Sequence, residues 1–169
     1  MEDRGRSLGC RWAFLAVLTI FLLSWPVAAG GGQIETELSA FRVVVGQDGK
    51  EELMPADKAK PGEVIEYVLI CTNKGTALID NLQPTLPIPQ DTEYMPGTAR
   101  PSVVLASLDG KTFAPVPLRR SVKNADGKIV EEEVPYREYR FLRWRLGRLE
   151  PGKGATVKAR VRIAAEKND

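Results

Sequence analysis

Hydrophobic and polar residues alternate along several short stretches of the chain, which is the pattern of half-buried β-strands. The clearest stretch covers residues 156–163, where one face is apolar and the other polar. The apolar face holds Val157, Ala159, Val161 and Ile163, and the polar face holds Thr156, Lys158, Arg160 and Arg162. This pattern predicts a strand with one dry and one solvated face, as antiparallel sheets allow.

A second alternating stretch surrounds Cys71. Ile65, Tyr67, Leu69 and Cys71 fall on one face, while Val68 and Ile70 make the other face partly apolar. This strand is therefore expected in the centre of a sheet. Two further stretches, 34–45 and 139–146, change phase halfway, which predicts a β-bulge or a strand that passes from one sheet to the other.

Turn-forming residues recur every ten residues or so, as Asp-Gly, Asn-Lys-Gly and Pro-Gly. They separate about seven short strands, so we predict an all-β fold, an immunoglobulin-like two-sheet antiparallel β-sandwich. The proline-rich segment Leu82–Pro89 is expected at an edge or crossover, since proline cannot donate to a central ladder. Residues 119–136 are expected to form an additional hairpin.

The N-terminus has the layout of a secretory signal peptide. Arg4, Arg6 and Arg11 precede an apolar run at 12–23, and small residues follow up to Ala29. We predict a signal helix over 1–29, cleavage after Ala29, and one domain over 30–169. The alternative is an uncleaved membrane anchor, but the apolar run is shorter than the roughly 20 residues that span a bilayer. The protein is thus expected in the periplasm, at the cell surface or outside the cell.

Composition excludes several kinds of chemistry. The chain has 24 basic and 22 acidic residues, a net charge of +2, and no histidine. This balance does not favour nucleic acid or an anionic membrane surface as a partner, and a membrane contact would come only through the signal segment if it stays uncleaved. Cys71 is the only cysteine after Ala29, without a histidine to activate it or further ligands to share a metal. We expect a buried small hydrophobe, with an intermolecular disulfide as the alternative.

A set of residues between 61 and 163 resembles the conserved-repeat domain of bacterial cell-surface proteins, the domain of unknown function eleven. The residues that carry the resemblance are Pro61, Gly62, Glu63, Tyr67, Asn73, Gly75, Leu86, Pro87, Tyr94, Trp144, Leu149, Pro151 and Gly152. The resemblance implies a secreted immunoglobulin-like sandwich without known catalytic residues. It implies no cofactor and supplies no ligand.

Two groups of residues are candidate sites. Arg137, Arg140, Arg143 and Arg145 alternate with aromatic residues, a pattern that can bind acidic polymers; an anionic envelope glycan is the sensible target for an exported protein. The alternative is a solvated face on which an antiparallel neighbour pairs these charges across strands, with the acidic residues 131–133 just upstream and Glu138 within the stretch. Asp80, Asp91 and Glu93 could hold calcium, although acidic residues in loops are commonly only solvated.

We therefore expect a non-catalytic, exported protein of the bacterial cell envelope that contacts another envelope component, a protein or a glycan. The hairpin and the segment Leu82–Tyr94 are the expected contact surfaces. One alternative is a module that binds a small ligand or glycan through exposed rings of Tyr94, Tyr136 or Trp144. Another is an envelope enzyme with a carboxylate or metal site.

Overall fold

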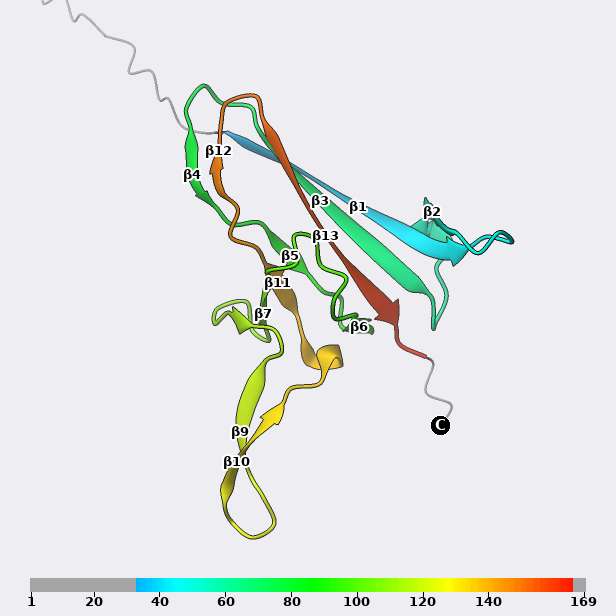
Figure 1. Cartoon of the computed structure of the whole chain (residues 1–169), viewed down its shortest axis with the longest axis vertical. Coiled ribbons are helices and arrows are strands. Elements are labelled where there is room, and N and C mark those ends of the chain that lie inside the picture. The colour runs from blue at the N-terminus through cyan, green and yellow to red at the C-terminus, as the bar shows by residue number, and fades with distance from the viewer. Residues whose placement is uncertain (1–32, 166–169) are drawn as a thin grey trace, which may run out of the picture.

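The computed structural model describes residues 33–165, which form an all-β antiparallel sandwich (Figure 1). The predicted signal segment 1–29 lies outside the described residues. Every pair of neighbouring strands is antiparallel. The fold class expected from the alternating pattern is thereby confirmed.

The larger sheet has five strands in the order β2-β1-β3-β13-β6. They are β1 (Ile34–Val45), β2 (Glu51–Pro55), β3 (Val64–Asn73), β6 (Thr92–Tyr94) and β13 (Gly154–Ile163). The strand around Cys71 is central, as predicted, because β3 pairs with β1 on one side and β13 on the other. The alternation in β13 is also confirmed, since Val157, Ala159 and Val161 are fully buried.

The second layer consists of shorter strands. A four-stranded sheet has the order β5-β11-β7-β8, and β12 pairs with β4 beside it. The strands are β4 (Ile79–Leu82), β5 (Thr85–Pro87), β7 (Leu105–Ser107), β8 (Ala114–Pro115), β11 (Phe141–Arg143) and β12 (Gly147–Leu149). The proline-rich segment does supply an edge strand, β5, as expected.

A hairpin and two 3-10 turns complete the described part of the chain. β9 (Arg119–Lys123) and β10 (Ile129–Glu133) pair only with each other among the described strands, and the hairpin projects below the sandwich in Figure 1. The 3-10 turns are η1 (Ala56–Lys58) and η2 (Tyr136–Glu138). The described chain has 13 strands, more than the seven or so predicted, because prolines and turns divide the longer apolar stretches.

The hydrophobic core lies between the layers. Leu69 and Val157 of the large sheet belong to one buried cluster with Leu86, Ala106 and Leu142 of the second layer. The bulkiest fully buried side chains are those of Trp144, Tyr94 and Tyr139. Ring centroids of Tyr136 and Tyr139 are 5.3 Å apart and each lies 6.0 Å from that of Tyr94, so the three rings pack at the end from which the hairpin projects.

The two predicted phase changes have different outcomes. The bulge expected in 34–45 is wrong, because the register of β1 with β3 runs unbroken from Ile34 opposite Asn73 to Val43 opposite Val64. The apolar pattern shifts there because β1 acquires a second neighbour, β2, only from Phe41 onward. In 139–146 the chain does change sheets, from β11 paired with β5 to β12 paired with β4.

Candidate contact surfaces

The hairpin β9–β10 is almost entirely exposed. Ile129 is 77% exposed and Val130 is 41% exposed, so two large apolar side chains face solvent on a projecting element. An isolated two-stranded hairpin is marginally stable in water. An element that exposes apolar side chains without contributing to the core is a candidate contact surface.

Charged side chains hold the two strands of the hairpin together. Arg120 pairs with Glu132 at 2.8 Å and with Glu138 at 2.7 Å, and the hydrogen bond with Glu132 raises the pKa of Arg120. Arg119 lies 3.9 Å from both Glu131 and Glu133. The acidic run 131–133 therefore pairs across strands with an antiparallel neighbour, β9, as the alternative predicted. Its partners are Arg119 and Arg120, which precede the candidate arginines in the sequence.

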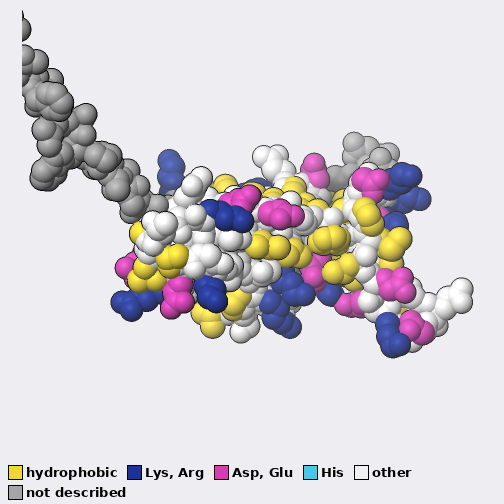
Figure 2. All heavy atoms as spheres, turned by 90° about the horizontal axis from the view of Figure 1, so that it is seen from above, with side chains coloured by type: hydrophobic (Ala, Val, Ile, Leu, Met, Phe, Trp, Pro, Cys, Tyr) yellow, Lys and Arg dark blue, Asp and Glu magenta, His cyan; other side chains and the backbone are white. Residues whose placement is uncertain are grey.

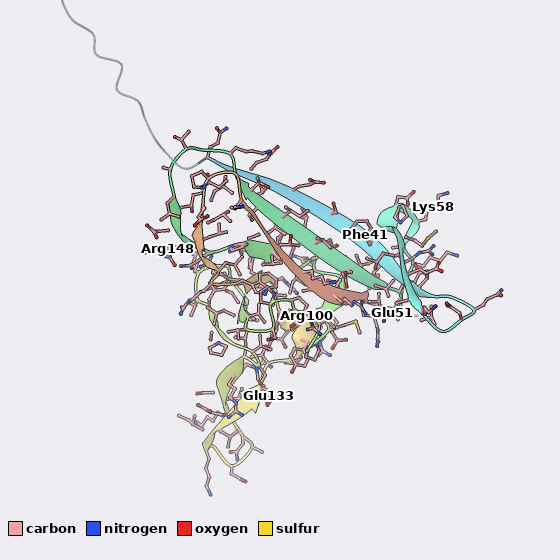
Figure 3. The ribbon with its side chains drawn as sticks, turned by 45° about the horizontal axis from the view of Figure 1, so that its top comes forward. Phe41, Glu51, Lys58, Arg100, Glu133 and Arg148 are labelled. Atoms are coloured by element: carbon pink, nitrogen blue, oxygen red, sulfur yellow. The ribbon has the colours of Figure 1, made fainter. Side chains whose placement is uncertain are left out.

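The base of the hairpin is fixed to the core. The backbone N–H of Val134 donates to the carbonyl of Leu118 at 2.9 Å. The N–H of Leu118 in turn donates to the hydroxyl of Tyr139 at 2.6 Å, inside the buried aromatic cluster. Figure 3 shows the hairpin extending from the sandwich, with Glu133 labelled at the end of the hairpin nearest the sandwich.

The four arginines predicted as a contact surface do not form a single patch. Arg143 is half-buried, with its guanidinium 3.6 Å from the ring centroid of Phe113 and its Nε donating to Thr85 at 2.9 Å. Arg140 donates to the backbone carbonyls of Arg137 and Tyr139 at 2.8 Å each. Arg137 and Arg145 are exposed.

Arg137 and Arg140 share one open hollow of about 480 Å³ at the end of the sandwich. Arg162 contributes a third positive charge there. The hollow also contains three carboxylates, those of Asp91, Glu93 and Glu138, so its charge is balanced. This balance does not favour an anionic polymer.

Two of the three rings proposed for ligand binding, those of Tyr94 and Trp144, are buried. Tyr94 is 2% exposed and Trp144 is 1% exposed, and the indole N–H of Trp144 donates to the carbonyl of Pro101 at 2.8 Å. Tyr136 is partly buried against both neighbouring tyrosines. The expectation that Tyr94 or Trp144 forms a binding platform is therefore wrong.

Cys71 lies in the core, as expected, and is 2% exposed. Burial raises the pKa of its thiol, so the reactive thiolate is disfavoured. The candidate calcium ligands do not lie together, since Asp80 pairs with Arg148 at 3.1 Å while Asp91 and Glu93 line the hollow near Arg137 and Arg140. Within residues 33–165, no group of three or more acidic, histidine or cysteine side chains is placed to hold a metal ion.

Most of the motif residues stabilise turns or fill the core. Asn73 is fully buried and its side-chain amide donates to the carbonyls of Ala77 at 2.8 Å and Leu149 at 3.0 Å. Its side-chain oxygen accepts from the N–H of Gly75 at 3.0 Å, which fixes the turn after β3. Gly62 and Gly152 have φ of +87° and +71°, the left-handed conformation that favours glycine after proline in such turns.

The remaining motif residues lie in a turn, in the core or at the surface. Glu63 accepts from the N–H of Lys60 at 2.7 Å and pairs with Arg42 at 3.1 Å, which closes the turn before β3. Leu86 and Leu149 are buried and Tyr67 is half-buried, whereas the rings of Pro61, Pro87 and Pro151 are exposed. None of these positions gathers reactive groups into a cleft of the described chain.

Sequence reasoning missed one charged network. Glu66 lies on the second, partly apolar face of β3 and was not among the candidate residues, yet it is only 3% exposed. Its carboxylate accepts from Lys158 at 3.1 Å and from Arg160 at 2.8 Å, and Arg160 also binds Glu51 of β2 at 2.7 Å. Burial alone would raise the pKa of Glu66, but the hydrogen bonds from Arg160 and Lys158 outweigh it and leave the pKa lowered.

This network lies on the outer face of the large sheet. Glu66 stands between Phe41 of β1 and Arg160 of β13 in the register. The sequence contains two signs of this network. Glu66 is flanked by the apolar residues Ile65 and Tyr67, and the stretch 156–163 has a basic face. Figure 3 shows Phe41 and Glu51 at the same end of the sheet, and Figure 2 shows hydrophobic side chains as a broken band among charged ones across the face seen from above.

Comparison of the chain with models of protein families, with curated proteins and with solved structures finds no match. The resemblance to the conserved-repeat domain therefore stays a prediction. No helix in the described part of the chain is long and apolar enough to cross a membrane.

Proposed function

We propose that this protein is an exported, non-catalytic contact module of the bacterial cell envelope, which binds another envelope component through the hairpin β9–β10. The single observation that carries the proposal is the projecting hairpin with Ile129 and Val130 exposed. Export rests on the predicted signal segment, and the bacterial envelope rests on the resemblance to the conserved-repeat domain.

Two features of the fold support a contact role for the hairpin. It extends away from the sandwich, so it can reach a partner without disturbing the core. Its base is tied to the buried hydroxyl of Tyr139, so its direction is fixed before binding. Preorganisation of this kind lowers the entropic cost of association.

Crosslinking in cells of the native host tests the proposal. The tagged full chain is compared with the double variant Ile129→Asp, Val130→Asp, and with the control variant Val103→Asp. Val103 is 83% exposed on a different segment, so it matches Ile129, at 77%, in exposure.

We expect one envelope partner to be captured by the native chain and by the control, and lost from the double variant. Equal capture by all three proteins would contradict the role of the hairpin. Circular dichroism and urea unfolding would show that the exposed substitutions leave the fold intact.

A further inference from the structure

The first half of β1 has one edge that no described strand covers. β3 pairs with Ile34–Val43, but on the other side β2 pairs only with Phe41–Val45. The region 34–40 therefore presents an open strand edge in the largest sheet of the molecule. Open edges of this kind are templates for pairing with another chain.

The hydrogen-bond pattern identifies which backbone groups point outward. The N–H of Lys74 in the β3 turn donates to the carbonyl of Gln33, and the N–H of Gly46 donates to the carbonyl of Lys50 in the β2 turn, both at 2.8 Å. Because bonding sides alternate along an antiparallel strand, odd-numbered positions of β1 bond β3 and even-numbered positions face the other way. The outward groups thus belong to Ile34, Thr36, Leu38 and Ala40.

The side chains of these same residues point toward the core side of the sheet. Thr36 stands opposite Cys71 and Leu38 opposite Leu69, both of which are buried. Nevertheless Ile34 is 42% exposed and Leu38 is 50% exposed, because the shorter second layer does not extend over this part of β1. An inward-facing apolar surface is left uncovered.

A groove of about 450 Å³ adjoins this surface. One wall is formed by Ile34 and Thr36 of β1 with Leu69 and Cys71 of β3, and the other by residues 79–85 of β4 and the proline-rich segment. Among the described strands β4 pairs only with β12, and β5 pairs only with β11, so both are edge strands. The groove therefore runs between these edges and the open edge of β1. An added strand along β1 would place every second side chain in this groove.

The opposite face of the same segment is acidic, which restricts the partner. Glu35 and Glu37 lie on the outer face, and of these only Glu35 has an ion pair in the described chain, an exposed contact with Lys74 at 3.2 Å. Antiparallel pairing of two copies of β1 along this edge would bring glutamates opposite or diagonal to one another. Like charges in those positions are destabilising, so a second copy is disfavoured.

We propose that the open edge of β1 between Ile34 and Ala40 binds an extended segment of a partner protein in which apolar and basic residues alternate. The apolar side chains enter the groove beside Ile34 and Thr36, and the basic side chains lie next to Glu35 and Glu37. The inference rests on the proposed function, since it names the class of protein segment that a contact module of this shape recognises.

Amide hydrogen exchange measured by NMR tests the proposal. The full chain is produced in its own host, purified as that host processes it, and mixed with a synthetic peptide of about seven alternating lysine and valine residues, a length that matches the open edge. A peptide of alternating glutamate and valine is the control. We expect the lysine peptide to slow exchange at the amides of Thr36 and Leu38 by about tenfold or more, while the amides of Glu35 and Glu37, already bonded to β3, change little.

Variants separate strand addition from loose charge attraction. Leu38→Lys should abolish protection by placing a charge on the uncovered apolar surface that adjoins the groove, and Glu37→Lys should shift the preference toward the glutamate peptide. Glu150→Lys is the matched control, because Glu150 is exposed and has no ion pair within the described residues, and it should behave as the native chain does.

Equal protection by both peptides, or none by the lysine peptide, would overturn the proposal. So would sedimentation showing that the free chain dimerises with these amides already protected. If the lysine peptide fails to bind, the capture experiment on the hairpin still stands as a separate test of the proposed function. If the peptide binds but the native chain and the hairpin double variant capture the same partner equally, only the role of the hairpin is refuted.

Discussion

Replacing Glu66 by glutamine should destabilise the protein in a pH-dependent way. The carboxylate is 3% exposed and accepts charged hydrogen bonds from both Lys158 and Arg160. Glutamine keeps the shape but offers one accepting oxygen, and its amide N–H₂ group then faces a donor. Loss of one charge-assisted hydrogen bond costs about 2 kcal/mol.

Two features keep the cost from being larger. Arg160 retains Glu51 as a bidentate partner, with contacts of 2.9 and 2.7 Å. Lys158 is 41% exposed, so its ammonium can turn to water. A loss of about 2 kcal/mol corresponds to a decrease of roughly 6–8 °C in the midpoint of thermal unfolding for a domain of this size.

The pH dependence follows from the lowered pKa of Glu66 in the folded state. A carboxylate with a lowered pKa stabilises the fold above its ordinary value of 4.5, and this contribution is lost as the pH falls through the folded value. The difference in unfolding free energy between the native chain and Glu66→Gln should therefore be constant from pH 7 to 5.5 and shrink below about 4.5.

Urea unfolding between pH 7 and pH 3 measures this difference directly. Glu150→Gln is the control, because Glu150 is exposed and has no ion pair within the described residues. A difference below about 0.5 kcal/mol at pH 7 would place the network among ordinary surface pairs. A difference that persists unchanged at pH 3 would refute the assignment to the ionised carboxylate.

Three further predictions concern the core and the hairpin base. Asn73→Ala should cost about 2–3 kcal/mol in urea unfolding, because the carbonyl of Leu149 loses its buried donor; an unchanged midpoint would contradict this. The thiol of Cys71 should react with Ellman's reagent only as the protein unfolds, since burial raises its pKa, and rapid labelling of the native chain would be the opposing result. Tyr139→Phe should cost about 1–2 kcal/mol of unfolding free energy and speed amide exchange at Leu118, whose N–H loses its acceptor. Unchanged exchange at Leu118 would show that the hydroxyl of Tyr139 does not hold the base of the hairpin.

Alternation and turn chemistry were sufficient to predict the large sheet. In β13 the period of two decides which side chains are buried, and the two-sided apolar character of β3 reflects neighbours on both sides. The burial of Cys71 follows from the same phase. These features are local, so a single sequence contains them.

Features that depend on distant partners could not be predicted in the same way. The phase change in β1 resembled a bulge, but its cause is the limited length of β2, which pairs only from Phe41 onward. Glu66 could not be singled out from the sequence because its partner Arg160, which also binds Glu51, lies 94 residues further along the chain. The aromatic residues near the arginines suggested a binding face, yet Trp144 fills the core.

The central claim is that the exposed tip of the hairpin touches an envelope partner. Placing a photo-activated crosslinking amino acid at Ile129 in the host, with Val103 as the equally exposed control position, tests this claim most directly. The account predicts a discrete crosslinked product from position 129 and none of that mass from position 103. Identical products from both positions, or only free protein from position 129, would contradict it.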